Sequence, residues 1–276
     1  NSQIYGKKLN TNVFIKCSLS MEPVVDAMEG AGTKPRDTTT DKLLGGRVRL
    51  VQPCTGYRAA MDAVLLAAAI PAANGERVMD LGSGVGAASM CLASRIGGCQ
   101  IDGVEVQPDL VSLGEENILL NGFERRVRFL VADVSTLDGG FDEKFDHAMI
   151  NPPYLQAAQA QPTDSPDLAR VEVGVGLDEW VDAAASVIRD GGTMTFIHRA
   201  DRLDELLARI RTVAGDISVV PIWPGPGKEA KRVIASARKG RRGPLRLCPG
   251  LTLYDNEGQY TSLANQILLA GSALEF

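Results

Sequence analysis

Short apolar segments alternate with helix-forming segments over most of the chain, and this alternation limits the possible folds most strongly. Expected strands lie at 47–53, 77–81, 100–106, 127–133, 145–151, 193–199, 217–223 and 230–240. Expected helices lie at 59–70, 87–97, 108–122, 177–192, 200–215 and 260–271. Strands joined by helices of this length form right-handed βαβ units. The sequence therefore predicts an α/β protein, with a seven-stranded mainly parallel sheet and helices on both faces.

Residues 42–276 are expected to form a single domain. The segment 29–41, "EGAGTKPRDTTTD", is rich in small and polar residues, so 1–41 is interpreted as a disordered extension or linker. Residues 1–20 lack the apolar core of a signal peptide, and no apolar run reaches 18 residues. The five cysteines are scattered and there are two histidines, which argues against a metal site or a disulfide framework. We therefore expect a cytoplasmic protein with no membrane span and no metal.

A glycine-rich loop follows the expected strand 77–81. In "VMDLGSGVGAAS", Gly82 and Gly84 allow a tight turn and a close approach of the backbone to a ligand. Ser83 lies between them. The loop alone also fits a dinucleotide-binding motif, so a nicotinamide oxidoreductase is an alternative. Asp80 argues against it, because a carboxylate before the glycines suits a cationic group better than a pyrophosphate.

Two further carboxylates end the next two expected strands. Glu105 follows the glycine loop by about 20 residues, which is the usual place for an acceptor of ribose hydroxyls. Asp133 ends the third strand, where it can accept a hydrogen bond from the exocyclic amine of an adenine. Parallel strands bring these ends to one edge of the sheet. Together they predict a ligand with a positive end, a ribose and an adenine, which describes S-adenosylmethionine.

The tetrapeptide Asn151-Pro152-Pro153-Tyr154 follows the fourth expected strand. Prolines fix the backbone and leave carbonyl oxygens as acceptors, although a simple rigid turn is the alternative. An aromatic amine can donate one N–H to the Asn151 side chain and the other to the Pro152 carbonyl, while Tyr154 stacks on the base. This fixed geometry would direct the nitrogen lone pair at a methyl donor. A glutamine amide fits the same place.

These motifs resemble, in order and spacing over 77–154, the Rossmann-like, amino-group-modifying S-adenosylmethionine methyltransferases. The segments "LLGGRVRLVQPCTGYRAAMDAVLLAAA", "FIHRADRL" and "RVIASARKGRRGPLRL" resemble, more narrowly, the bacterial valine-tRNA adenine-N6 methyltransferase family. That resemblance covers about residues 43–271. It implies a class I methyltransferase fold, S-adenosylmethionine as methyl donor, and a tRNA adenine as substrate.

The resemblance also implies roles for particular residues. The methyl donor would be bound by Asp80, Gly82, Ser83, Gly84, Glu105, Asp133 and Asn151. The target nitrogen would be held by Asn151, Pro152 and Tyr154. Many relatives have Thr-Asp or Ser-Asp before the first strand, and here the pair is Met61-Asp62. Tyr57 and Asp62 are the candidates for donor contacts in this segment.

The segment 227–246 is strongly basic in a chain with a net charge of −5. It carries eight Lys and Arg residues against one acidic residue, Glu229. We interpret seven of them as a phosphate-binding track for structured RNA, with tRNA as the first choice: Lys228, Lys231, Arg232, Arg238, Lys239, Arg241 and Arg242. A solvated edge strand guarded by cations is the alternative. A protein-glutamine methyltransferase of the release-factor type and a non-catalytic RNA-binding module also remain open.

Overall fold

The computed structural model describes residues 37–276 except 57, 60, 138–139, 142–143 and 154–174. Two compact units divide the chain, Asn1–Ala31 and Gly32–Phe276, and the described residues all belong to the second. Tyr57 and Tyr154 therefore lie outside the described residues.

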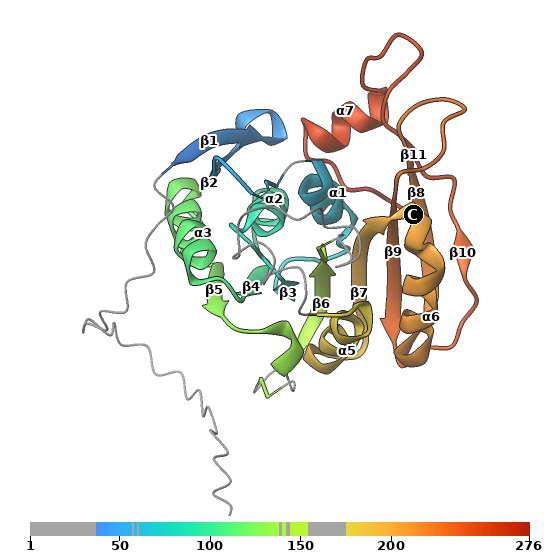
Figure 1. Ribbon diagram of the computed structural model, residues 1–276, viewed down its shortest axis with the longest axis horizontal. Helices are drawn as coiled ribbons and strands as arrows, with labels where there is room; N and C mark the ends of the chain where they lie inside the picture. The colour runs from blue at the N-terminus through green and yellow to red at the C-terminus, as the bar shows by residue number, and fades with distance from the viewer. Residues whose placement is uncertain (1–36, 57, 60, 138–139, 142–143, 154–174) are drawn as a thin grey trace, which may run out of the picture. The chain divides into compact units, whose positions relative to one another are not determined.

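A central sheet with seven principal strands organises this unit (Figure 1). The strands are β3 (Arg77–Leu81), β4 (Gln100–Glu105), β5 (Val127–Val131), β6 (Phe145–Ile150), β7 (Ile188–Arg199), β8 (Ala214–Trp223) and β9 (Arg232–Lys239). Their order is β8-β9-β7-β6-β3-β4-β5, and only β9 runs antiparallel to both of its neighbours. Two two-residue strands, β10 (Arg246–Leu247) and β11 (Leu251–Thr252), pair with the outer edge of β8.

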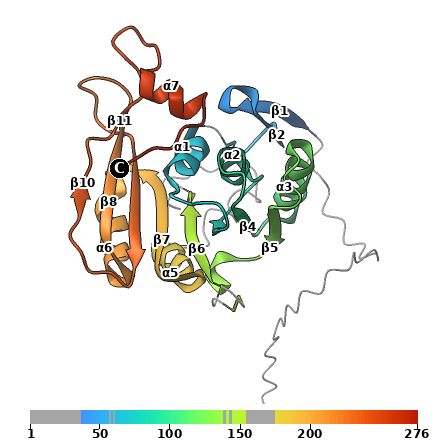
Figure 2. The same ribbon diagram turned by 180° about the vertical axis from the view of Figure 1, so that it is seen from behind.

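Helices cover both faces of the sheet, as the alternating pattern predicts. One face packs against α1 (Met61–Ala69), α2 (Ala87–Arg95), α3 (Pro108–Asn121) and α7 (Ser262–Leu268). The other packs against α5 (Leu177–Val187) and α6 (Leu203–Val213). Single turns of 3₁₀ helix lie at Leu44–Gly46, Val134–Thr136 and Ala200–Arg202. Figure 2 shows from behind the same separation of α5 and α6 from α1, α2 and α3.

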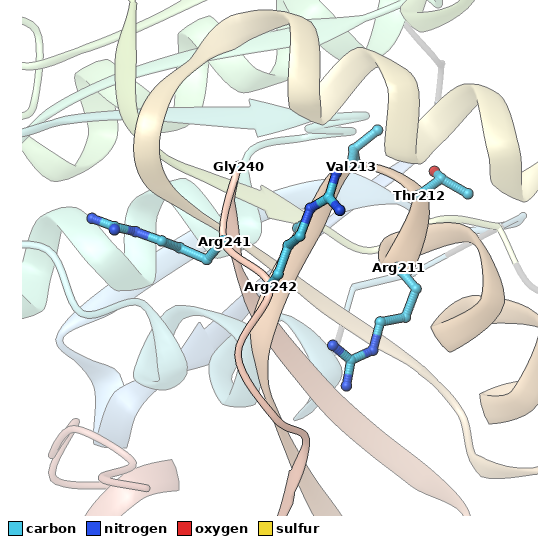
Figure 3. Close-up of a pocket in the computed structure, with 7 residues that line it drawn as sticks. Arg211, Thr212, Val213, Gly240, Arg241 and Arg242 are labelled. Atoms are coloured by element: carbon cyan, nitrogen blue, oxygen red, sulfur yellow. The ribbon is translucent and has the colours of Figure 1, made fainter.

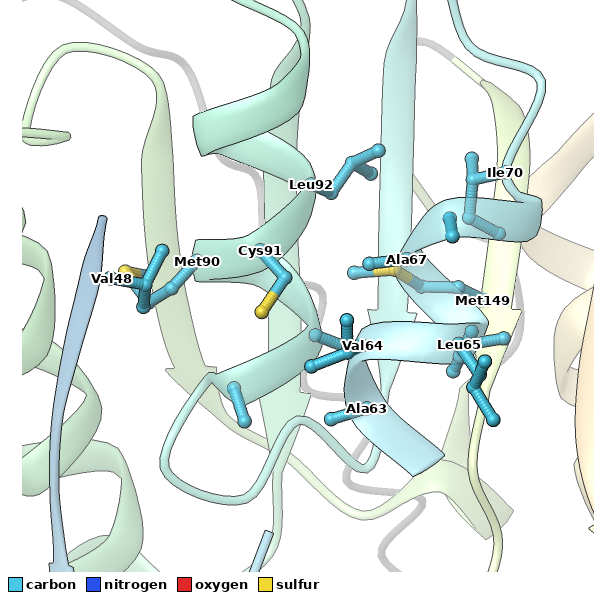
Figure 4. Packing of buried hydrophobic residues seen from close by; sticks show 14 of the residues in the cluster. Val48, Ala63, Val64, Leu65, Ala67, Ile70, Met90, Cys91, Leu92 and Met149 are labelled. Carbon is cyan, nitrogen blue, oxygen red and sulfur yellow. The ribbon is translucent and has the colours of Figure 1, made fainter. Parts of the chain in front are cut away.

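Two hydrophobic cores follow from the alternation of side chains along each strand. On β3, Val78 belongs to the core beneath α1 and α2, whereas its neighbour Met79 belongs to the core beneath α5 and α6. Figure 4 shows part of the first core, to which α1 contributes Leu65, α2 contributes Leu92 and β6 contributes Met149. Burial on both faces explains why the strand sequences read as nearly continuous apolar runs.

Three expected boundaries are wrong. Residues 188–192 form the first part of β7 and not the end of the expected helix 177–192. β8 begins at Ala214, inside the expected helix 200–215. The expected linker also extends too far. Its last residues belong to β1 (Thr38–Leu43), which pairs antiparallel with β2 (Val48–Pro53), so that the two strands share a ladder of backbone hydrogen bonds.

Buried polar side chains attach the β1–β2 hairpin to the chain around the sheet. Gln52 is buried, donates to the Asp41 carboxylate at 2.6 Å, and accepts from the Ala59 N–H at 2.9 Å. Asn117 of α3 is fully buried. Its side-chain oxygen accepts from the Val51 N–H, and its side-chain nitrogen donates to the carbonyls of Val51 and Val85. Asn117 thereby connects β2 and α3 to the glycine loop, whose Val85 carbonyl it holds by a hydrogen bond.

Candidate functional site

The predicted site residues lie at the carboxyl edge of neighbouring parallel strands. Leu81 of β3 is in register with Ile150 of β6 on one side and with Val104 of β4 on the other. The glycine loop and Asn151 therefore leave adjacent strands, which lie about 4.8 Å apart. The chain runs outward in both directions from β3 and β6, so this is the topological switch point, where α/β sheets bind ligands.

Asp80 lies at the end of β3, is only 3% exposed, and accepts a hydrogen bond from the Ser89 hydroxyl at 2.6 Å. Burial raises the pKa of Asp80 to about 7, and the nearby Glu105 carboxylate adds to the increase. A buried carboxylate with no cationic partner among its described contacts would be stabilised by a bound cation. Ser89 was not predicted, although a serine in the first turns of the following helix is a usable signal.

Glu105 joins the end of β4 to two backbone groups. Its Oε2 accepts from the Gly84 N–H and its Oε1 from the Gln107 N–H, both at 3.0 Å. Each carboxylate oxygen retains a second acceptor position for a ribose hydroxyl. Glu105 thus shapes the glycine loop in addition to the predicted role.

Aromatic rings pack directly against the glycines of the site, and the sequence did not predict these contacts. A Cβ on Gly82, whose φ is +70°, would lie 2.6 Å from the Trp180 ring, and one on Gly103 would lie 2.4 Å from the Phe129 ring. These glycines are required by close approach. The buried Ser83 hydroxyl and the Trp180 indole N–H have no hydrogen-bond partner among the described residues.

Asn151 and Pro152 follow β6 directly, with Asn151 half-buried and Pro152 buried. The structure therefore brings this predicted acceptor pair next to the glycine loop. Asp133 is half-buried, and its Oδ1 accepts from the Ser135 N–H at 2.9 Å as the cap of a 3₁₀ turn. Its contact to an adenine stays a prediction.

Asp62 lies in the first turn of α1 and forms an ion pair with Arg232 at 2.9 Å. Arg232 begins β9 opposite Arg199, so this pair lies at the same edge as the site. His198 is 1% exposed, and burial lowers its pKa, as expected for a structural histidine.

The basic segment does not form one track at the site. Lys228, Lys231 and Arg232 lie at the carboxyl edge, because Arg232 pairs with Ile222 near the end of β8. Lys239 pairs with Ala214 at the start of β8, so Arg238, Lys239, Arg241 and Arg242 lie at the opposite edge. The residues between span the length of β9, roughly 23 Å at 3.3 Å per residue. The predicted phosphate-binding residues are therefore divided between the two edges of the sheet, and their contact with RNA stays a prediction.

The sequence pattern of the methyltransferase small domain family matches residues 59–214, which include the ends of β3, β4, β5 and β6. The chain belongs to this family. The expected enzyme class, an S-adenosylmethionine-dependent methyltransferase, is confirmed. The predicted class I fold is confirmed as well.

Relatives and solved structures agree with this membership. The chain is 30% identical to a tRNA1(Val) (adenine(37)-N6)-methyltransferase from Actinobacillus pleuropneumoniae serotype 5b, over 76% of this chain and 87% of that protein. It is 28% identical to the protein of the same name from Yersinia pestis, over 72% and 81%. The crystal structure of a predicted O-methyltransferase from Agrobacterium tumefaciens superposes with a TM-score of 0.67 at 26% identity, over 78% of this chain and 98% of that one.

The residues present fit S-adenosylmethionine. Asp80 offers a buried negative charge, Glu105 offers acceptors, and Ser83 has a buried hydroxyl without a protein partner in the described structure. Within the described residues, no three His, Cys, Asp or Glu side chains are grouped to hold a metal ion. No helix among them is long and apolar enough to cross a membrane.

Proposed function

We propose that this chain methylates the N6 amine of an adenine in tRNA, with adenine 37 of a valine tRNA as the first candidate. The observation that carries this proposal is the adjacency of the glycine loop after Leu81 to Asn151-Pro152 after Ile150. This adjacency would bring a donor bound at the loop beside an amine held by the tetrapeptide. The position and the tRNA are taken from the names of the relatives.

S-adenosylmethionine supplies a methyl group bonded to a positively charged sulfur. The Asn151 side-chain oxygen accepts one N–H of the target amine, and the Pro152 carbonyl accepts the other. These bonds draw the nitrogen toward tetrahedral geometry, so that its lone pair points at the methyl carbon. The electron pair of the broken carbon–sulfur bond stays on sulfur, and the nitrogen releases one proton to water. Tyr154 would stack on the base, and Tyr57 and Asp133 would complete the donor site.

The target adenine has to leave its stack to enter such a pocket, and loop bases do so at the lowest cost. Lys228 and Lys231 are exposed at the site's edge of the sheet and are the proposed contacts to phosphates near that base. Arg232 is a weaker candidate, because its guanidinium is paired with Asp62. The proposed substrate acts in the cytoplasm, which remains the expected location.

The test offers tritiated S-adenosylmethionine with total small RNA in one reaction and with a peptide-chain release factor in another. Both products are digested and separated as nucleosides or amino acids. Label in N6-methyladenosine supports the proposal. Label in methylglutamine would assign the chain to protein methylation, and binding of the donor without label in either product would contradict the proposed substrate.

A further inference from the structure

A cavity of about 520 Å³ lies at the amino edge of the sheet, away from the site described above. It is lined by the end of α6, the start of β8 and the turn after β9, including Arg211, Arg241 and Arg242. Figure 3 shows Arg211 and Arg242 on one side of this turn and Arg241 extending away on the other. None of the described residues that line the cavity is acidic.

The backbone around the cavity is firmly held. The Gly240 N–H donates to the Val213 carbonyl at 3.0 Å, and Arg211 Nη1 donates to the Gly243 carbonyl at 2.9 Å. β8 bulges between Gly215 and Ser218, and Asp216 in this bulge has a φ of +51°. A Cβ on Gly215 would lie 2.5 Å from the Arg241 carbonyl oxygen. The turn that carries Arg241 and Arg242 is thus packed directly on β8 and needs little ordering to bind a ligand.

The positive charge in the cavity is not neutralised by the protein. Within the part of the chain that the structure describes, Arg211, Arg241 and Arg242 form no ion pair, whereas Arg189 nearby pairs with Asp146 and Lys239 with Asp190. Asp216 is the acidic residue on the adjoining bulge, and it packs beside Gly243. Three arginines that remain available for a ligand favour an anion, and guanidinium groups match phosphate oxygens well.

The directions of the side chains indicate which kind of anion. Guanidinium groups that diverge around an open turn suit several phosphates spaced along a chain better than one small ion. From the turn, the chain 243–247 runs along the outer side of β8, and Arg246 of β10 donates to the Ser218 hydroxyl in the middle of β8 at 2.8 Å. One further arginine therefore lies beside the cavity along the outer edge of the sheet.

We propose that this cavity is a second phosphate-binding site, which holds the sugar-phosphate backbone of the tRNA substrate at a distance from the methylated base. The assignment rests on the proposed function and extends it. The site would favour full-length tRNA over its isolated anticodon stem–loop, because the full-length molecule offers backbone beyond the anticodon stem to the far edge of the sheet. Free phosphate or a nucleoside phosphate carries the same chemistry, so the test separates these sources.

The experiment compares wild type with Arg241→Gln/Arg242→Gln, a double variant that leaves the Arg211–Gly243 bond in place. Lys42→Gln/Arg125→Gln is the matched control, since it removes the same charge from exposed residues elsewhere. For full-length tRNA, KM should rise about tenfold in the cavity variant, with kcat unchanged and a shallower salt dependence. For the anticodon stem–loop, both constants should match wild type. Arg241→Lys/Arg242→Lys should retain most of the affinity, because it keeps the charge.

Several results would overturn the assignment. An equal loss on the stem–loop and on full-length tRNA would assign the effect to the methyl-transfer site. The cavity variant could instead keep the KM for tRNA of wild type and lose a binding of ATP or inorganic phosphate that wild type shows. That result would assign the cavity to a free phosphate ligand. Failure of wild type to methylate either RNA would contradict the proposed function, and binding of full-length tRNA by the two variants would then still decide on the cavity.

Discussion

The Glu105 carboxylate accepts a hydrogen bond from the Gly84 N–H at 3.0 Å, and this bond ties the end of β4 to the glycine loop after β3. The same carboxylate holds the Gln107 N–H through its other oxygen. Glu105 is 7% exposed, so these bonds form in a place with little access to water. The residue predicted to hold the ribose therefore also fixes the loop that the donor would contact.

Glu105→Ala should weaken binding of S-adenosylmethionine by about tenfold to a hundredfold. The reason is that hydrogen bonds to a charged group contribute about 1.5–3 kcal/mol, and the two backbone N–H groups would also lose their acceptor. Isothermal titration calorimetry measures the affinity. Glu115→Gln on exposed α3 surface is the control and should bind as wild type. Unchanged affinity in Glu105→Ala would remove Glu105 from the donor site.

Asp80 should make both stability and donor binding depend on pH. Burial raises its pKa to about 7 from the ordinary 3.8, so between about pH 4 and 7 the folded state holds more protons than the unfolded state. The free energy of unfolding should then fall as pH rises through this window, by at most about 1.4 kcal/mol per pH unit, and level off above pH 7. Asp80→Asn should lose this contribution, as urea titrations from pH 5 to 8 would measure.

The same titration has the opposite effect on the donor. A sulfonium is attracted by the ionised form of Asp80, so the affinity for S-adenosylmethionine should increase from pH 6 to pH 8. In Asp80→Asn the affinity should be weaker and nearly flat with pH. A pH profile for the variant that parallels wild type would assign the dependence to another group.

Gly103→Ala should destabilise the protein by about 1–3 kcal/mol, because the new methyl group would enter the Phe129 ring. Phe129→Leu removes part of that ring and should be less harmful in the Gly103→Ala background than in wild type. Urea midpoints for the two single variants and the double variant give the coupling. Strict additivity would show that the ring is not what requires glycine at this position.

Lys231 and Arg232 are neighbours in sequence but should respond differently to replacement. Arg232→Gln breaks the ion pair with the partly buried Asp62 and should lower the free energy of unfolding by about 1 kcal/mol. Lys231→Gln changes an exposed side chain, so it should leave the free energy of unfolding within about 0.5 kcal/mol of wild type. It should also reduce the slope of log K for tRNA binding against log salt concentration by about one. A stability loss in Lys231→Gln with unchanged RNA binding would refute the assignment.

The positions of most strands along the chain and the placement of the site residues at strand ends could be predicted, because each depends on local patterns. Apolar runs located β3 to β6, and the parallel arrangement brought Gly82, Glu105 and Asn151 to one edge. The start of β7 at Ile188 could not be predicted, because "IRDGG" has a turn-like composition and joins the strand through the pairing of Ile188 with Phe145 of β6, ahead of a shift in register.

Contacts between distant segments were also beyond the sequence. Phe129 fits against Gly103 only after β4 and β5 pair, and Trp180 reaches Gly82 from a helix about 100 residues further along. The distribution of the basic segment also depends on strand pairing, because β9 carries Arg232 and Lys239 to opposite edges.

The central claim is that the tetrapeptide beside the glycine loop positions the N6 amine of adenine 37, and one assay tests it directly. Tritiated S-adenosylmethionine is offered with valine tRNA transcripts that carry adenine or guanine at position 37, using wild type and Asn151→Ala. We expect close to one methyl group per adenine-37 transcript from wild type, none on the guanine-37 transcript, and a rate about 10²–10³-fold lower in Asn151→Ala with donor affinity retained. Equal labelling of both transcripts, or full activity of Asn151→Ala, would contradict the account.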